Sequence, residues 1–410
     1  MTVVTEALPT VPTTTPGPTA ASPTRRRLLF VLPDLKGGGA PRVTLALLAA
    51  LDPADYELSL LNLGAPGARL QADVPAPVRL LQRPRWLPGL IGAKLATLWH
   101  ARRQDLLIAA VEMRATFCVH FAARWLRKPA IAWVHIAFEH WARGFSARHH
   151  RRARAAYRDI GHAVFVAEGA RDSMQRWLGT SRETWRCIPN LFSSGHYRDS
   201  VAMPEAHRAL LERMRERPTL IGIGRLEARK GFDRLLQGAA RARAAGLDFD
   251  IVLLGEGPLR NALCEQAAQL GLSRQLHLPG HVGNPLTWLA AASVYVLSSQ
   301  LEGLPTTILE AFSTRTPVIA FDCPSGPREL LDHGRAGRLL PMDDVDALAL
   351  SIIELLESPS LRQQLGDAGH ARLPHYQAAA VLPKWQALFD ELAGDGAPAQ
   401  ALSRAREPTG

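Results

Sequence analysis

Cysteine is scarce in this chain of 410 residues. Cys118, Cys187, Cys264 and Cys323 are widely separated, and no two of them have the short spacing of a zinc site. A dense disulfide framework is equally unsupported, because such frameworks belong to small secreted domains with many closely spaced cysteines. We therefore expect a reducing compartment, with each thiol buried as a small apolar side chain.

Long apolar runs are also missing. No stretch approaches the roughly 18 consecutive apolar residues that a membrane-spanning helix requires, so any membrane contact would be peripheral. Residues 1–24 are rich in Thr, Pro and Ala and lack the basic start and apolar core of a secretory signal. We predict a disordered leader over 1–24 and a disordered tail over 393–410.

Aromatic residues amount to only 6% of the chain, whereas positive charge is abundant. Residues 25–186 contain 26 Lys and Arg against 12 Asp and Glu, although the whole chain carries a net charge of only +10. This basic half would suit an anionic membrane surface, a phosphorylated acceptor or nucleic acid. No nucleic-acid-binding motif accompanies the charge, so we predict no nucleic-acid partner.

The length and the 47% hydrophobic content suit two globular domains with cores of their own. Apolar runs predict strands at 27–33, 57–62, 106–111, 130–135 and 163–166, with helical stretches between them. This alternation predicts an α/β fold with parallel sheets covered on both faces. We place an N-terminal domain at 25–192, a C-terminal domain at 193–375 and a last helix at 376–392 that crosses back to the first domain.

Two glutamates stand eight positions apart around the start of a predicted helix. An apolar strand at 294–297 leads to Glu302, Pro305 suits the first helical position, and Glu310 would lie about two turns inside the helix. The free N–H groups of the first turn form an anion site, because the helix dipole also favours negative charge there. A phosphate flanked by hydroxyl-binding carboxylates would fit a nucleotide sugar, although both glutamates could instead be solvated surface residues.

Two cations, Arg225 and Lys230, follow the predicted strand 220–224 across a turn closed by Gly231. Their convergence would offset the negative charge of a diphosphate leaving group. Together with the Glu-x7-Glu spacing and the segments 316–320 and 323–329, this series resembles the retaining glycosyltransferases of family 4. The resemblance is most specific over residues 220–340. It implies the GT-B fold, in which two Rossmann-like domains face each other across a deep cleft.

The resemblance also implies roles for individual residues. Arg225 and Lys230 would clamp the diphosphate, Glu302 would bind the sugar hydroxyls, and Glu310 would bind the ribose. The turn Gly303, Leu304 and Pro305 would receive the terminal phosphate. The backbone of His281 and Val282 would contact the nucleobase.

His135 ends the predicted strand 130–135, and ligands of open α/β sheets bind beyond such carboxyl ends. By resemblance it would contact the sugar or the departing phosphate, although a purely structural histidine is an alternative. Gly38 and Gly39 form a glycine-rich turn that lets a ligand approach the backbone, unless the turn is merely a tight connection. Pro41 departs from the glutamate that relatives often have.

Asp248 and Asp250 form an Asp-x-Asp pattern that could suggest a metal site. They precede a buried strand, whereas ligands gather beyond strand ends, so we interpret them as a polar strand entrance. We predict no metal and no cofactor other than the nucleotide-sugar donor.

Residues 83–103 alternate apolar and basic side chains without any acidic residue. On a helix this pattern would suit a membrane-surface element, but an ordinary core-facing helix is an equal alternative.

The sequence thus predicts a retaining, metal-independent hexosyltransferase. It would move sugar from a nucleotide-diphosphate donor, with a UDP-sugar favoured over GDP-mannose, to a lipid-linked or oligosaccharide acceptor in surface polysaccharide synthesis. We expect a cytoplasmic protein, peripheral at the inner face of the membrane through its basic N-terminal domain. The alternatives are a glycosyl phosphorylase or a nucleotide-sugar epimerase on the same fold, or a non-catalytic protein that binds membranes or glycans.

Overall fold

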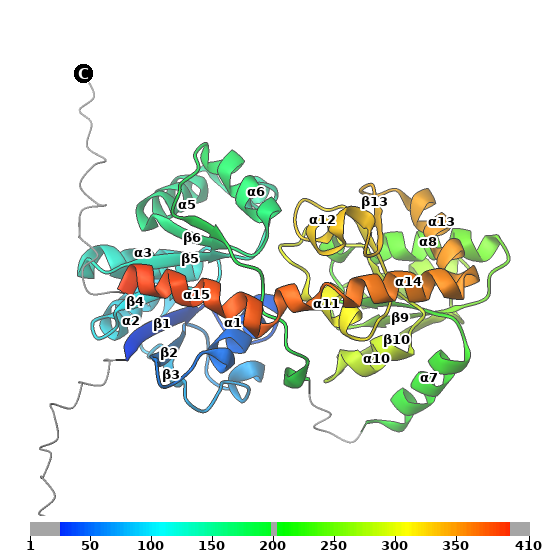
Figure 1. Cartoon of the computed structure of the whole chain (residues 1–410), viewed down its shortest axis with the longest axis horizontal. Coiled ribbons are helices and arrows are strands. Elements are labelled where there is room, and N and C mark those ends of the chain that lie inside the picture. The colour runs from blue at the N-terminus through cyan, green and yellow to red at the C-terminus, as the bar shows by residue number, and fades with distance from the viewer. Residues whose placement is uncertain (1–24, 198–202, 394–410) are drawn as a thin grey trace, which may run out of the picture.

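The computed structural model describes residues 25–197 and 203–393. The leader predicted over 1–24, and positions 394–410 of the predicted tail, lie outside the described residues. The described chain forms two α/β domains next to each other, each built on one parallel sheet (Figure 1).

The sheet of the N-terminal domain has seven parallel strands among the described residues, in the order β3-β2-β1-β4-β5-β6-β7. The strands are β1 (Arg26–Leu32), β2 (Tyr56–Asn62), β3 (Arg79–Gln82), β4 (Leu106–Ala109), β5 (Ala130–Val134), β6 (His162–Phe165) and β7 (Trp185–Cys187). The helices between them are α1 (Gly39–Ala50), α2 (Gly89–Ala101), α3 (Arg114–Leu126), α4 (Phe138–Trp141), α5 (Ala147–Ile160) and α6 (Glu168–Leu178).

Strand β1 shows why the sheet strands read as continuous apolar runs. Leu28 and Phe30 point into one core cluster, whereas Leu29 and Val31 point into another that includes buried residues of α2 and α3. All four side chains are fully buried, because helices cover both faces of a parallel sheet.

The sheet of the C-terminal domain has six parallel strands in the described chain, in the order β10-β9-β8-β11-β12-β13. These strands are β8 (Thr219–Ile223), β9 (Asp250–Leu254), β10 (Leu276–Gly280), β11 (Val294–Leu297), β12 (Val318–Phe321) and β13 (Arg338–Leu340). The helices are α7 (Glu205–Glu216), α8 (Phe232–Ala244), α9 (Arg260–Gln269), α10 (Pro285–Ala291), α11 (Thr306–Ser313), α12 (Pro327–Leu330), α13 (Val345–Glu357) and α14 (Pro359–His370).

Both sheets reverse their strand order once, between β1 and β4 and between β8 and β11. Ligands of open α/β sheets bind beyond the carboxyl ends of the strands at such a switch point. The predicted α/β architecture of two Rossmann-like domains is therefore confirmed, and its topology indicates where to look for a site.

Three edge strands and one helix start differ from the sequence prediction. β3, β7 and β13 were not expected, because they are short, lie at the sheet edges and carry charged or half-exposed residues in place of an apolar run. Helix α1 begins at Gly39, which the sequence predicts to lie in the glycine-rich turn. Pro41 lies in its first turn, where a missing N–H costs no helical hydrogen bond.

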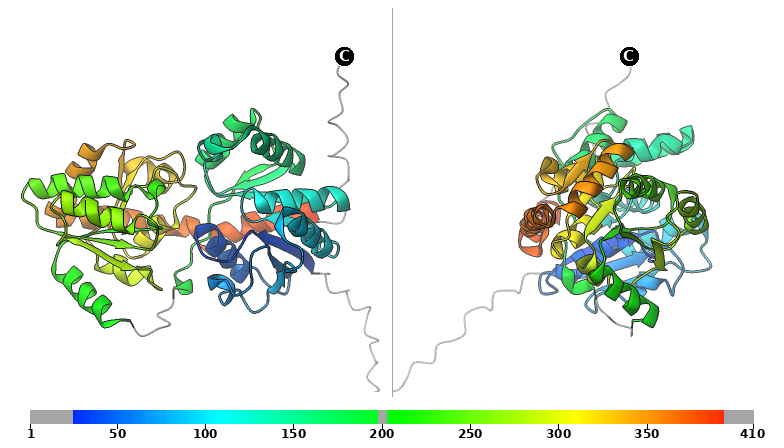
Figure 2. Two further views of the ribbon diagram at one scale, coloured as in Figure 1. Left: turned by 180° about the vertical axis from the view of Figure 1, so that it is seen from behind. Right: turned by 90° about the vertical axis from the view of Figure 1, so that its right-hand side faces the viewer.

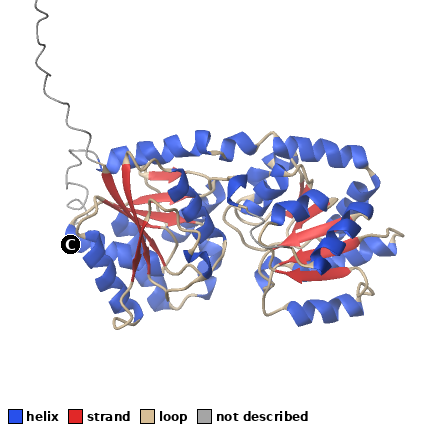
Figure 3. Cartoon of the chain, turned by 90° about the horizontal axis from the view of Figure 1, so that it is seen from below, coloured by secondary structure: helices blue, strands red, loops and turns tan. Residues whose placement is uncertain are grey.

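The last helix, α15 (Ala378–Ala393), runs from the C-terminal domain along the N-terminal one, as the views from behind and from below show (Figures 2 and 3). Its Trp385 ring packs edge-on against Trp133 of β5, with 4.7 Å between ring centroids. Phe389 packs against Tyr56 of β2 at 5.7 Å. Aromatic contacts thus attach α15 to the N-terminal sheet.

All four cysteines are free, and Cys118 and Cys323 are buried. Cys187 is half-buried and Cys264 is exposed, so the expectation that every cysteine packs in a core is wrong for Cys264. Within the described parts of the chain, no helix combines the length and apolar character needed to cross a bilayer.

Candidate active site

The ends of β8 and β11, adjacent at the switch point, bring Lys230 and Glu302 together. Lys230 Nζ donates a hydrogen bond to Glu302 Oε1 at 2.5 Å, and both side chains are nearly buried. Burial opposes the ionisation of Glu302, but the charge and the hydrogen bond of Lys230 outweigh it, so the pKa of Glu302 is below its usual value. Glu302 is therefore a carboxylate at neutral pH.

Gly231 fixes the position of the Lys230 turn. It has a left-handed φ of 64°, and a Cβ placed there would lie 2.0 Å from the carbonyl oxygen of Ser298 at the end of β11. The Ser298 hydroxyl in turn donates to the Lys230 carbonyl at 2.9 Å. The two strand ends can approach this closely only because glycine has no side chain.

Arg225 does not share this arrangement. Its side chain is 71% exposed, and its Nε lies 3.6 Å from a carboxylate oxygen of Glu227. Arg229 also pairs with Glu227. The structure thus places Lys230 against Glu302 and leaves Arg225 as a solvated side chain at the rim of the same turn.

Helix α11 differs in two details from the sequence prediction. Pro305 is the residue before the first helical one, Thr306, and does not occupy the first helical position. Glu310 is consequently the fifth residue of the helix, little more than one turn inside it and not two. The later start of the helix follows from the extended backbone of Pro305, whose ψ of 106° keeps it outside the helix.

The segment Gly303–Leu304 lies at the contact between the domains. A Cβ on Gly303 would lie 1.7 Å from the carbonyl oxygen of His135, and the N–H of Ala137 donates to the Glu302 carbonyl at 3.3 Å. The carboxyl end of β5 therefore meets the turn before α11, as expected if both sheets direct their strand ends to one site.

The imidazole of His135 is half-buried and neutral. Its Nε2 lies 3.0 Å from the Ala110 carbonyl oxygen, so this nitrogen carries the proton, and its ring packs on Trp133. Burial lowers the pKa of His135 to about 4. The side chain can offer its other nitrogen as a hydrogen-bond acceptor, but it is not a cation for phosphate at neutral pH.

Glu112 was not a candidate from the sequence, yet it lies beside His135. Its carboxylate accepts a hydrogen bond from the His135 N–H, and burial raises its pKa to about 7. A single glutamate after β4 gives no sequence signal of this kind, because the interaction joins positions 23 residues apart.

Glu310 is buried, and its carboxylate accepts a 2.6 Å hydrogen bond from the hydroxyl of Tyr197. Burial raises the pKa of Glu310, although this hydrogen bond and the charge of Arg42 oppose the shift. Tyr197, from the connection between the domains, and Arg42, from α1, were not predicted. Their positions follow from how the two domains are joined, which no local motif encodes.

The glycine turn before α1 is open. Gly37 and Gly38 have positive φ values of 140° and 106°, and a Cβ on Gly37, Gly38 or Gly39 would meet nothing within 4 Å. Gly37 and Gly38 are therefore needed for their positive φ values, and not because a neighbouring atom leaves no room for a side chain.

His281 and Val282 follow β10 directly. Burial lowers the pKa of His281, and the charges of Arg69 and Arg42 lower it further. Both arginines belong to the N-terminal domain, so the predicted nucleobase segment faces that domain.

The Asp-x-Asp pattern is an ion-pair cluster at the opposite end of β9 from the site. Asp250 is fully buried and is held by Arg213 at 2.6 Å and by Arg217 at 3.3 Å. Asp248 pairs with Arg217 and Arg243. The two carboxylates thus stabilise the start of the strand, as the interpretation as a polar strand entrance requires.

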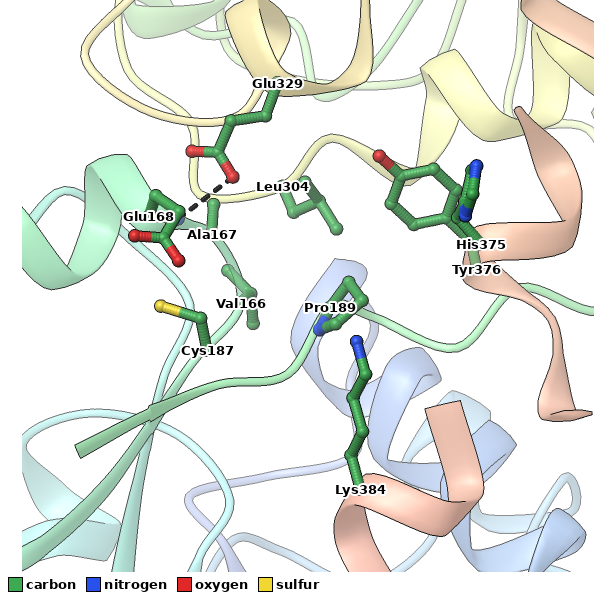
Figure 4. A pocket seen from close by; sticks show the side chains of 10 residues that line it. All are labelled: Val166, Ala167, Glu168, Cys187, Pro189, Leu304, Glu329, His375, Tyr376 and Lys384. Carbon is green, nitrogen blue, oxygen red and sulfur yellow. Dashed lines mark hydrogen bonds between the residues drawn. The ribbon is translucent and has the colours of Figure 1, made fainter. Parts of the chain in front are cut away.

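A second contact joins the domains beside a pocket of about 220 Å³ (Figure 4). The Glu329 carboxylate accepts hydrogen bonds from the N–H groups of Glu168 and Gly169, both at 2.9 Å, at the start of α6. The pocket is lined by Val166, Ala167, Glu168, Cys187, Pro189, Leu304, Glu329, His375, Tyr376 and Lys384. It shares only Leu304 with the predicted site, so it belongs to the domain junction.

Two facing Rossmann-like domains with paired charges at their strand ends are the arrangement of the GT-B fold class. Residues 205–372 match the family described as "Glycosyl transferases group 1", and residues 37–193 match "Glycosyltransferase Family 4". The chain therefore belongs to the group 1, family 4 glycosyltransferases.

Of three similar relatives, two are named as glycosyltransferases and one as a phosphotransferase. An "Uncharacterized glycosyltransferase" of Haemophilus influenzae is 21% identical over 88% of this chain and 98% of its own length. The "Lipopolysaccharide core biosynthesis glycosyltransferase LpsE" of Rhizobium meliloti is 33% identical over 48% of this chain. An exopolysaccharide phosphotransferase of Streptomyces coelicolor is 29% identical over 57% of this chain. The chain spans 54% of LpsE and only 24% of the phosphotransferase.

Solved structures share the fold. HepE of Anabaena, crystallised with UDP-glucose, superposes with a TM-score of 0.75 at 19% identity, covering 89% of this chain and 100% of HepE. The likeness confirms the predicted GT-B fold.

Proposed function

We propose that this chain is a retaining hexosyltransferase that uses a nucleotide-diphosphate sugar, with a UDP-sugar favoured over GDP-mannose. The acceptor is a hydroxyl of a lipid-linked glycan in surface polysaccharide assembly. The observation that carries the proposal is the buried Lys230–Glu302 pair at the ends of β8 and β11. Relatives named for lipopolysaccharide core synthesis and for a diphospho-undecaprenol acceptor support the choice of acceptor.

The donor would bind across the strand ends of the C-terminal domain. Lys230 faces the diphosphate, and the exposed Arg225 is free to swing onto it. Glu302 accepts hydrogen bonds from the sugar hydroxyls and Glu310 from the ribose, since a carboxylate has acceptor sites for two adjacent hydroxyls. The first N–H groups of α11 complete the phosphate site.

Transfer proceeds by attack of the acceptor hydroxyl on the anomeric carbon, from the face that the phosphate leaves. The bond between the anomeric carbon and the phosphate oxygen breaks, and that oxygen takes the acceptor proton. Lys230 offsets the charge that develops on the phosphate, so no metal is needed. The contact between His135 and Gly303 helps to exclude water, which would otherwise compete as a nucleophile.

A lipid-linked acceptor would place the reaction on the cytoplasmic face of the cell membrane, with this protein as a peripheral component. Its basic N-terminal half, with 26 Lys and Arg against 12 Asp and Glu over 25–186, suits an anionic surface.

The test is to incubate purified protein with radiolabelled UDP- and GDP-sugars and membrane extract. Label that enters an organic-phase lipid supports transfer. Free sugar phosphate would indicate a phosphorylase, and an epimerised donor would indicate an epimerase. A thermal-shift screen with the same donors identifies the base, because a ligand that binds only the folded state raises its melting temperature. No shift with any donor would contradict the proposal.

A further inference from the structure

An exposed apolar face covers the outside of α2 and the end of α3. We call it the tryptophan face, and it consists of Trp86, Ile91, Leu95, Trp99 and Trp125. Trp86 is 78% exposed, Ile91 76% and Trp125 69%. Among the described residues one further large hydrophobic side chain, Leu350 on α13, is comparably exposed. The large apolar side chains on the surface of the described chain are therefore concentrated on α2, the turn before it and the end of the neighbouring α3.

The packing of α2 explains why these side chains point outward. The helix buries its small residues against the sheet and α3, namely Gly92, Ala93, Ala96, Thr97 and Ala101. Ile91, Leu95 and Trp99 recur every four positions and line the opposite side. The core-facing alternative therefore holds for the small residues of this segment and for Leu90 and Leu98, which pack against the core cluster. Ile91, Leu95 and Trp99 remain exposed.

Positive charge surrounds this face. Residues 83–103 and 114–128 contain nine Lys and Arg and no Asp or Glu. Arg102 lies over the Trp99 ring at 5.0 Å, and Lys94 lies over Phe121 at 5.2 Å. Among the described residues no carboxylate pairs with Arg85, Arg103 or Arg127.

We propose that the tryptophan face docks on the surface of an anionic phospholipid bilayer. The inference rests on the proposed function, because it names the surface that carries the lipid-linked acceptor. Indole rings prefer the boundary between headgroups and acyl chains, the aliphatic side chains between them enter the apolar layer, and the arginines meet lipid phosphates.

A second copy of the chain fits this face poorly. A twofold contact would bring the Lys and Arg side chains of 83–103 and 114–128 in one copy against the same residues of the other. Neither segment contains an acidic residue that could offset this repulsion. Nucleic acid would not explain Ile91 and Leu95, which offer neither charge nor a stacking surface.

The position of the face relative to the site is consistent with this role. Trp86 follows shortly after β3 ends at Gln82, so it lies near the carboxyl edge of the sheet that also carries Gly38 and His135. α2 and α3 pack side by side, toward the end of the domain remote from the C-terminal domain (Figure 1). The tryptophan face would thus extend from the carboxyl edge of the N-terminal sheet, where the candidate site lies, along the outside of the domain.

The experiment is co-sedimentation of the full chain with vesicles of phosphatidylcholine, with and without phosphatidylglycerol. We compare the wild type with a triple Trp86→Ser, Ile91→Ser, Trp99→Ser variant and an Arg85→Glu, Arg103→Glu variant. Leu350→Ser is the matched control, since it removes an exposed apolar side chain elsewhere. Both sets of changes should lower binding to anionic vesicles about tenfold or more, and the control should bind as the wild type does. Circular dichroism checks that each variant is folded.

Failure of the wild type to bind anionic vesicles, or unchanged binding by the folded triple variant, would overturn the inference. So would a dimeric wild type that the triple variant makes monomeric in sedimentation equilibrium. Because binding is measured without donor, vesicle binding without any sugar transfer would refute the proposed function and leave the docking surface standing.

Discussion

At the scale of single residues, Lys230 and Glu302 form a salt bridge whose two side chains are nearly buried. Such a pair contributes little net stability, because desolvation cancels much of the attraction. Its value is positional: each group holds the other in place before the donor arrives. Lys230 is thus oriented toward the strand ends where a diphosphate would lie.

We expect Lys230→Met to lower kcat by about 10² to 10³, the usual cost of removing one group that stabilises transition-state charge. Glu302→Gln should also lower kcat, because Lys230 loses the carboxylate that holds it in place. Steady-state assays with the donor identified by thermal shift would measure the effect. Arg241→Met, which removes an exposed cation paired with Asp346, is the control and should retain activity. Wild-type activity in either site variant would refute these assignments.

Glu112 predicts a pH dependence of stability. Its pKa rises to about 7 in the folded state, so folding favours its protonated form. This contribution is fully present below the unfolded pKa near 4.5 and is lost as the pH rises through about 7. At pH 8, Glu112→Gln should therefore increase the free energy of unfolding by up to about 3 kcal/mol. The melting temperature should rise accordingly.

The same substitution should change the melting temperature little near pH 4.5, where wild-type Glu112 is already protonated. His135 shifts in the other direction: its pKa of about 4 makes stability fall as the pH drops from about 6.5 to 4, in both proteins alike. An equal difference between the two proteins at pH 8 and pH 4.5 would show that Glu112 does not titrate in this range.

At the scale of elements, the turn after β8 depends on its closing glycine. Gly231→Ala should displace Lys230 from Glu302, because the new Cβ would meet the Ser298 carbonyl at 2.0 Å. Gly271→Ala is the matched control, with a similar φ of 71° but no atom within 4 Å of its Cβ. The control should cost about 1 kcal/mol of unfolding free energy from strain alone, and Gly231→Ala clearly more. Equal losses in urea titrations would contradict this account.

The strands buried on both faces were predictable, because helices on either side require an unbroken apolar run such as that of β1. β3, β7 and β13 were not, since short strands at a sheet edge carry no such run. The start of α11 was misplaced by one residue because Pro305 suits both the first helical position and the one before it.

The candidate site was predictable where chemistry is local. A cation after β8 and a carboxylate after β11 come together because those strands are neighbours at the switch point. Tyr197 and Arg42 approach Glu310 only through the way the two domains are joined, and no spacing in the sequence reports that.

At the scale of the whole molecule, Glu329 holds the two domains together by accepting two N–H groups of α6. Glu329→Ala should favour an open arrangement, raising the KM for donor more than it lowers kcat and increasing the radius of gyration in small-angle scattering. Glu354→Ala, which breaks an exposed ion pair with Arg338 inside the C-terminal domain, should change neither. An unchanged radius and KM in Glu329→Ala would show that this contact does not control closure.

Helix α15 has a practical consequence for recombining such enzymes. Its Trp385 and Phe389 complete the core under Trp133 and Tyr56, so part of the first domain is encoded by the last helix of the described chain. A chimera that exchanges donor specificity by swapping the second half of the gene should therefore keep residues 378–393 from the parent that supplies the first half. If the halves were joined at the linker alone, Trp133 and Tyr56 of one parent would pack against the α15 helix of the other.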